Sequence, residues 1–411
     1  MNWRLGWLPL ATLCAAQSAP AQQVGYKEAL RAARQEQPAL QAGELRIEGQ
    51  REAAEAADEL PDPRLRAGIL NLPVTGPAAF ELDRQLPTQI AIGIEQEIPN
   101  SAKRRARYGI ASSDIRSAQA RLGLAERDLG LSAGMAWIAL HFAQQRFNLA
   151  QSALADLRKL VPVANSAVAS GSARPAETLA IRRELLDIQD AITAIEADRE
   201  SAQARLSRYV RVEGPIAHGV PPAGDIDPAR LRQELDNNPE LLLADVARER
   251  AEAGASLARA EKRPDFGVNV SYGKRDSDFG DVISVMGSVT LPIFAGRRQD
   301  LRIAAAEAEA AAAVAEREDR LRALETQFQV DLAQWRSAAR QWQRAREELL
   351  PLARDRAELE TASFAAGRAD LIDVITAKTA LALLELKILA RAEAQVEAAA
   401  TLRLPYGEDT P

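Results

Sequence analysis

The chain has 411 residues, of which 47% are hydrophobic and 27% charged but only 4% aromatic. That balance is typical of long helices and coiled coils rather than of compact globular domains. The net charge of −6 comes from interspersed charges of both signs, without a concentrated basic stripe, and this excludes an obvious nucleic-acid partner.

The N-terminus has the features of an export signal. Arg4 precedes an apolar stretch over residues 5–16, and Ala19-Pro20-Ala21 provides a small-x-small cleavage site. We therefore predict a removable signal peptide over residues 1–21. The single cysteine, Cys14, is either removed with it or becomes a lipidated mature N-terminus, and Leu13 directly before it disfavours lipidation. No later stretch reaches the roughly 18 consecutive apolar residues of a membrane helix.

The remainder of the chain runs through the same events twice. Residues 22–225 and 226–411 each begin with a polar helical stretch, continue through two strand-like segments to a proline and a basic cluster, and end in Ala-rich helices. These landmarks recur about 200 residues apart, whereas a solenoid repeats every 20–50 residues or so. The sequence therefore predicts two copies of one domain.

Each half contains two predicted strands, over about residues 63–72 and 88–98 in the first half and 265–274 and 282–294 in the second. Large apolar residues alternate there with small or polar ones. An ordinary hairpin packed on a core shows the same alternation. Export, together with Gly, Ala, Ser and Asn at the alternate positions, favours membrane strands with one face toward a wet lumen. Since four strands cannot close on themselves and open edges are not tolerated in a bilayer, this interpretation requires several copies of the chain.

A long helical region follows each strand pair. The predicted helices cover about residues 100–160 and 173–210, then 297–350 and 352–403. A proline-free run of about 55–60 residues makes a helix roughly 80–90 Å long, which implies a bundle or coiled coil. Apolar residues at spacings of three and four between Ile181 and Ile195 predict a packing seam. We assign Trp137, Trp335 and Trp342 to packing. The predicted strand-to-helix junctions contain Pro99, Lys103, Arg104, Pro292, Gly296 and Arg297.

A glycine separates the helices of each half. Gly171 and Gly367 are conventional helix stops, and the chain restarts at Arg174-Pro175 and at Asp370. The plain interpretation is a helical hairpin turn. The functional interpretation is a tip, far from the strands, that contacts a partner.

These motifs resemble those of TolC, the outer-membrane channel family of bacterial tripartite efflux pumps, over about residues 26–406. The sequence Ala366-Gly367-Arg368-Ala369-Asp370-Leu371-Ile372-Asp373-Val374 is similar to the family's Val-Gly-Thr…Val-Asp-Val turn. The resemblance implies a mainly α fold with a small β part, in which three chains form a twelve-stranded outer-membrane barrel continued by a periplasmic helical tunnel. It also implies contact with outer-membrane lipid, an inner-membrane pump and a periplasmic adaptor. The implied adaptor-docking residues are Gly171, Ser172, Arg174, Glu177, Gly367, Arg368 and Asp370.

The same resemblance implies a pore constriction at the closed end of the tunnel. Asp373 falls where one acidic ring of the family lies, and the second ring falls at Thr376, where this chain departs from the pattern. A carboxylate ring would favour cations. Asp373 also suits an ordinary first-turn position stabilised by the helix dipole.

The compact length and the Pro-x-x-x-(Gly/Lys)-Arg pattern resemble the heavy-metal branch of the family, the CzcC and CusC type. Three Met, two His and no cysteine after residue 14 supply no dedicated soft-metal relay. We expect no cofactor and no resident metal. Whether the cargo is metal ions or other small molecules stays open.

We therefore interpret the chain as a passive exit duct and not as an enzyme. A secreted or periplasmic coiled-coil scaffold would explain the helices but not the duplicated strands. An exported hydrolase would need His141 or His218 beside a nucleophile, and neither lies in a recognisable catalytic loop.

Overall fold

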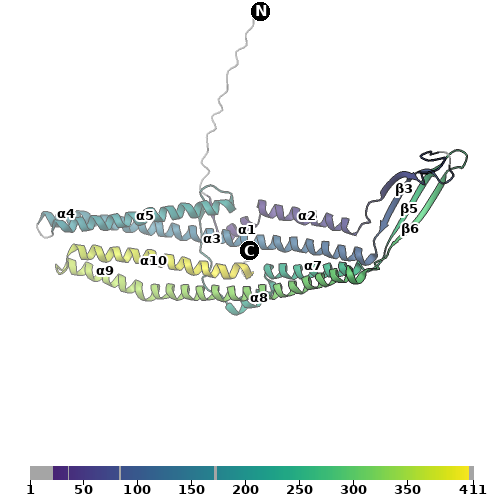
Figure 1. The fold of residues 1–411 in the computed structure, drawn as a ribbon. Helices are drawn as coiled ribbons and strands as arrows, with labels where there is room; N and C mark the ends of the chain where they lie inside the picture. The colour runs from purple at the N-terminus through teal and green to yellow at the C-terminus, as the bar shows by residue number, and fades with distance from the viewer. Residues whose placement is uncertain (1–21, 36, 83–84, 171–173, 407–411) are drawn as a thin grey trace, which may run out of the picture.

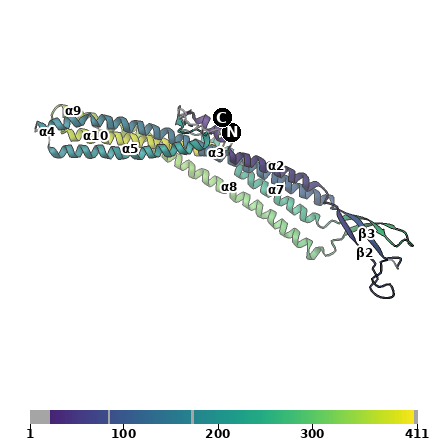
Figure 2. The same ribbon diagram turned by 90° about the horizontal axis from the view of Figure 1, so that it is seen from above.

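The structure, a computed structural model, describes residues 22–35, 37–82, 85–170 and 174–406. The predicted signal peptide with Cys14, and the predicted docking residues Gly171 and Ser172, lie outside the described residues. The molecule is a long bundle of helices with a sheet at one end and two helical turns at the other (Figures 1 and 2).

The described part of the first half contains five helices, which are α1 (Tyr26–Arg34), α2 (Pro38–Asp58), α3 (Ser101–Arg158), α4 (Leu160–Ala169) and α5 (Pro175–Val210). Helix α3 begins where the Asn100 side chain accepts a hydrogen bond from the Lys103 backbone N–H, an N-cap. Its 58 residues correspond to a length of about 87 Å. Figure 1 shows that α3 runs from the sheet to the distant turns.

The second half repeats this order. It contains α6 (Pro228–Gln233), a 3₁₀ turn (Glu234–Asn237), α7 (Pro239–Ala260), a second 3₁₀ turn (Ala295–Arg297) and α8 (Gln299–Arg344). After them come a π turn (Ala345–Leu349), α9 (Leu350–Ala365), α10 (Leu371–Arg403) and a last 3₁₀ turn (Leu404–Tyr406). No helix in the described part of the chain combines the length and the apolar character needed to cross a membrane.

The predicted helix boundary at Pro351 is wrong. The chain stays helical through this proline to Ala365, so the break within residues 352–403 falls at Gly367, the predicted helix stop, between α9 and α10. A proline normally breaks a helix because it lacks an N–H group and clashes with the preceding turn. Here the wider π turn directly precedes α9, so Pro351 falls in the first turn of a new α segment, where no N–H donor is required.

Four antiparallel strands form the main sheet in the order β2 (Arg64–Leu70), β3 (Gln89–Ile98), β5 (Asp265–Lys274) and β6 (Val282–Thr290). The central β3–β5 pairing joins the two halves of the chain. Gly93 is required there, because a Cβ atom would lie 2.7 Å from the Ser271 Cβ. Strand β6 ends at Thr290, earlier than the predicted residue 294, since Pro292 cannot donate to a ladder and the Ile293 N–H turns back to the Leu291 carbonyl.

The register of the sheet separates its two faces by chemistry. Opposed pairs such as Ile94–Val270 and Val270–Val285 place apolar residues of all the strands on one face. This apolar face is exposed and consists of Leu65, Ile69, Ile90, Ile92, Ile94, Ile98, Phe266, Val268, Val270, Tyr272, Ile283, Val285 and Val289. The opposite face carries mainly small and polar residues, with Leu70, Val282 and Met286 as the apolar exceptions, and an ion pair between Arg66 and Glu95. A water-soluble protein rarely exposes so large an apolar patch unless it is a contact surface.

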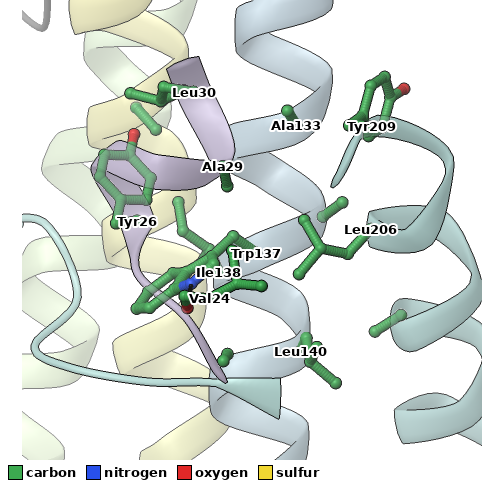
Figure 3. Close-up of a cluster of buried hydrophobic side chains, with 14 of the residues drawn as sticks. Val24, Tyr26, Ala29, Leu30, Ala133, Trp137, Ile138, Leu140, Leu206 and Tyr209 are labelled. Carbon is green, nitrogen blue, oxygen red and sulfur yellow. Dashed lines mark hydrogen bonds between the residues drawn. The ribbon is translucent and has the colours of Figure 1, made fainter. Parts of the chain in front are cut away.

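The largest core cluster lies at mid-length, around Trp137 (Figure 3). The Trp137 ring is fully buried, and its indole N–H donates to the Val24 carbonyl at 2.7 Å. Val24 belongs to a short strand, β1 (Gln23–Val24), that pairs in parallel with β4 (Ile216–Ala217), a pairing the sequence analysis missed. In the second half, Trp335 donates to the Gly224 carbonyl at the same distance of 2.7 Å. The duplication therefore extends to individual side-chain hydrogen bonds.

Candidate functional site

The turn between α9 and α10 is a Schellman motif. Gly367 has φ of +67°, and its N–H donates to the Phe364 carbonyl while the Arg368 N–H donates to the Ser363 carbonyl. This left-handed position favours glycine. Helix α10 then begins after Asp370, whose backbone N–H donates to the Asp373 carboxylate at 3.3 Å. The first role of Asp373 in the single chain is thus to satisfy the start of α10.

Helix α5 begins in the same way as α10. The Arg174 backbone N–H donates to the Glu177 carboxylate at 3.2 Å. Glu177 occupies in α5 the position that Asp373 occupies in α10, the third residue of the helix. Arg174 and Arg368 are both exposed.

The starts of α5 and α10, the latter with the turn at Gly367, lie at the same end of the molecule, opposite the sheet, and we call these two regions the tips (Figure 1). One hydrophobic cluster joins them, with Ile181 and Ile188 from α5 and Leu371 and Ile375 from α10. Its α5 residues are those of the predicted packing seam. Asp373 and Thr376 are both exposed, and their spacing of three residues places them on one face of α10.

A groove of about 610 Å³ lies near the tips, between the end of α3 and the α9–α10 hairpin. Most of its lining residues are Ala and Leu. Five charged residues also line it, three acidic (Asp156, Glu358 and Glu385) and two basic (Arg354 and Lys378), and Arg354 forms an ion pair with Glu385. The groove has no signature in the sequence, because α3 and α9 are about 200 residues apart.

The predicted junction residues lie where the strands meet the helices. Asp265, the first residue of β5, accepts hydrogen bonds from the Asn100 side chain at 2.9 Å and forms an ion pair with Lys103. Both groups of this ion pair are largely buried. Arg104 extends toward the Asp58 carbonyl at 3.5 Å, at the end of α2. The first basic cluster thus ties three segments of chain together at the foot of the sheet.

Pro292, Gly296 and Arg297 lie in the corresponding connection of the second half. Gly296 and Arg297 belong to the 3₁₀ turn between β6 and α8, and both are exposed. This connection therefore lacks the buried ion pair of the first.

A half-buried pair of carboxylates on α10, which faces α3, was not predicted from the sequence. Glu393 forms an ion pair with Arg146, and Glu397 lies one turn further along α10. Burial, and the neighbouring Glu393 charge, raise the pKa of Glu397 to about 7, against the opposing effect of Arg146. Burial likewise raises the pKa of Glu393, and Asp198 adds to the effect. The signal is weak in the sequence because both carboxylates belong to an ordinary Ala/Glu-rich helix.

Because the folded chain binds the Glu397 proton more tightly than the unfolded chain does, it loses stability as pH rises from about 4.5 to about 7. Glu397→Gln removes this loss. We expect the variant to be more stable than the parent by about 1–2 kcal/mol at pH 8, a value reduced for partial solvent screening, and no more stable at pH 4.5. Thermal unfolding between these two pH values measures the difference. The exposed Glu325→Gln is the matched control, and an equal gain in that variant would contradict the assignment.

The described residues contain no group of three or more His, Cys, Asp or Glu side chains placed to hold a metal ion. His141 stacks on Trp137 and contacts Gln145 at 2.7 Å, and burial lowers the pKa of its imidazole. His218 directly follows β4 in the sequence, and its backbone N–H donates to the Val24 carbonyl. The contacts of both histidines are those of residues that pack and stabilise the fold.

Comparison with known proteins agrees with this architecture. Residues 231–408 match the model of the family described as outer membrane efflux protein. The cobalt-zinc-cadmium resistance protein CzcC of Cupriavidus metallidurans is 25% identical over 289 residues, which cover 68% of each chain. The structure of CusC superposes with a TM-score of 0.78 at 15% identity, covering 93% of this chain and 92% of that one. The Campylobacter jejuni CmeC outer membrane channel superposes with a TM-score of 0.75 at 12% identity, covering 94% and 87%.

The fold and the sequence match together define a class, the TolC-like outer-membrane efflux proteins, which are channels and not enzymes. Residues 231–408 of this chain carry the sequence pattern of that family, and nearly the whole chain has the fold of the solved channels. The predicted mainly α fold class, the family and the outer-membrane location are confirmed.

Proposed function

We propose that three copies of this chain form the exit duct of a tripartite efflux system. The observation that carries this proposal is the sheet. Its exposed apolar face suits lipid and its small, polar face suits a water-filled lumen. Its outer strands, β2 and β6, each have one edge without a partner among the described residues. Pairing β2 of one copy with β6 of the next removes these open edges, and three copies give a closed barrel of twelve strands.

The mass of the detergent-extracted protein tests this proposal directly. Light scattering, corrected for bound detergent, should give three times the mass of the mature chain. A monomer or dimer would leave the sheet edges open and would favour the periplasmic scaffold instead.

The tips are proposed to dock on a periplasmic adaptor that links the duct to an inner-membrane pump. They lie at the end opposite the membrane sheet, and Arg174, Arg368 and Asp370 are exposed there. The groove beside them is lined by apolar and charged residues together, a lining that suits a docking amphipathic helix. Gly171 and Ser172, which lie outside the described residues, are included in this proposal by their place in the sequence.

Changes at the second tip test the docking role. Gly367→Val strains the left-handed turn, and Arg368→Glu reverses a docking charge. Each is expected to reduce efflux by at least about ten-fold, since opposed like charges cost several kcal/mol, without reducing the amount of protein in the outer membrane. Export of a fluorescent pump substrate gives the readout. Arg356→Glu, on the same hairpin but away from the tip, is the control. Normal efflux in both tip variants would refute docking at this turn.

Asp373 and Thr376 are proposed to face the narrow end of the tunnel. Asp373→Ala should raise single-channel conductance and weaken block by trivalent cations, because a carboxylate ring attracts cations into the pore. Thr376→Asp should strengthen the block, since it adds a second ring one turn away. Asp355→Ala, which removes an exposed carboxylate on α9 further from the tip, serves as the control. Unchanged conductance and block in both pore variants would remove this face of α10 from the constriction.

The cargo is proposed to be divalent metal ions. Support comes from the similarity to a protein named for cobalt, zinc and cadmium resistance. Deleting the chain from its own cell should then lower tolerance to these metals, and tolerance unchanged beside increased drug sensitivity would assign the duct to organic cargo.

A further inference from the structure

The apolar surface of the sheet continues beyond the end of β6. Leu291, Ile293 and Phe294 follow the strand and are 64%, 74% and 70% exposed. They precede the 3₁₀ turn that leads to α8. This places large apolar side chains at the level where the strands end and the polar helices begin, which in a membrane-embedded sheet is the interface with lipid headgroups.

A cleft of about 270 Å³ lies beside these residues and carries uncompensated positive charge. Four of the residues that line it are basic (Lys103, Arg263, Arg298 and Arg302) and two are acidic (Glu261 and Asp265), so the formal balance is 4 − 2 = +2. The two acids already form ion pairs, Asp265 with Lys103 and Glu261 with Arg302.

The excess charge therefore belongs to Arg263 and Arg298. Within the part of the chain that the structure describes, neither guanidinium forms an ion pair or a hydrogen bond. An arginine fork matches the oxygens of a phosphate group, and two forks in one cleft match a phosphate better than they match a single carboxylate.

We propose that this cleft binds the phosphate of a phospholipid headgroup in the membrane leaflet at the foot of the strands. The guanidinium groups of Arg263 and Arg298 hold the phosphate, while Leu291, Ile293 and Phe294 contact the acyl chains. The exposed apolar side chains beside the cleft favour a lipid over a free phosphate, which would gain nothing from them. The proposal rests on the membrane position of the sheet given above. It also gives a role to the second basic cluster, which at this junction has no buried ion pair to form.

Native mass spectrometry of the detergent-purified protein, titrated with phosphatidylglycerol, tests the site. The double variant Arg263→Gln/Arg298→Gln should bind the lipid about 30-fold more weakly, because each basic side chain near an anionic lipid surface contributes roughly a five-fold gain in affinity. Arg297→Gln is the matched control, since Arg297 lies in the same cluster but does not line the cleft. Lipid binding equal to that of the parent protein in the double variant would overturn the proposal.

A competition experiment separates lipid from soluble anion. Inorganic phosphate at millimolar concentration should displace little phosphatidylglycerol from the parent protein. Complete displacement would show a site for free anions and would also overturn the proposal. Cell fractionation and the oligomer mass are measured on the same variants, so that loss of membrane insertion, which concerns the proposed function, is distinguished from loss of lipid binding alone. If the double variant folds poorly, Arg298→Lys provides a second test. This variant keeps the positive charge and should retain most of the lipid binding.

Discussion

Replacing Val285 by arginine is expected to prevent stable insertion of the protein into the outer membrane. Val285 lies at the centre of β6, is 72% exposed, and pairs with Val270 on the apolar face. An arginine on the lipid face near the middle of a bilayer costs about 2–4 kcal/mol, and three copies in a trimer triple that cost. The measurement is the amount of protein in the urea-resistant outer-membrane fraction.

The neighbouring residue provides the control. Ser284 is also exposed, but it pairs with Ser271 on the opposite face. Ser284→Arg should insert normally, because its side chain points into the wet lumen. If Ser284→Arg fails to insert and Val285→Arg succeeds, the two faces have been assigned in reverse, and if both insert, the sheet does not contact lipid.

The second large effect is expected from Trp137→Ala. Trp137 is completely buried and ties α3 to β1 through its indole N–H (Figure 3). It also contacts the rings of Tyr26 and His141, with centroid distances of 5.5 and 5.0 Å. Truncation leaves a cavity and removes one of the two hydrogen bonds to the Val24 carbonyl, which keeps the one from the His218 N–H, and should lower the free energy of unfolding by about 3–5 kcal/mol. Thermal unfolding of the purified protein measures the change.

Trp342→Ala is the control for loss of a tryptophan as such. That ring is only half-buried, with the Arg346 guanidinium 5.2 Å from its centroid. A contact of this kind contributes about 0.5–1 kcal/mol, so the loss should be several times smaller. Equal destabilisation by both changes would show that the mid-length cluster is no more important than the surface of α8.

The sequence predicted those parts of the fold that repeat or have a period. Alternation between Gln89 and Glu95 located β3, and the spacing from Ile181 to Ile195 located a seam that is buried in the structure. The ends of the helices around Pro351 were predicted less well. A proline ends a helix only where the preceding turn leaves no room for its ring. The π turn before Pro351 depends on hydrogen-bond geometry that no local pattern reports.

The candidate site was only partly accessible from sequence for a related reason. The turn at Gly367 has a local signature, since a left-handed residue favours glycine. The groove near the tips, the cleft at Arg263 and the Glu393–Arg146 pair each join residues from distant segments. Such sites depend on how α3 packs against the second half, and a single sequence contains no record of that packing.

The matched tips have a consequence for the stoichiometry of any complex. In the proposed trimer, six tips surround one axis, and tips with Glu177 at the third helical position alternate with tips that have Asp373 there. The ring of tips therefore has three-fold symmetry in sequence, while its six similar helix starts give it approximate six-fold symmetry in backbone structure. Six identical partner subunits would meet two chemically different environments in alternation, so half of them would bind with one affinity and half with another.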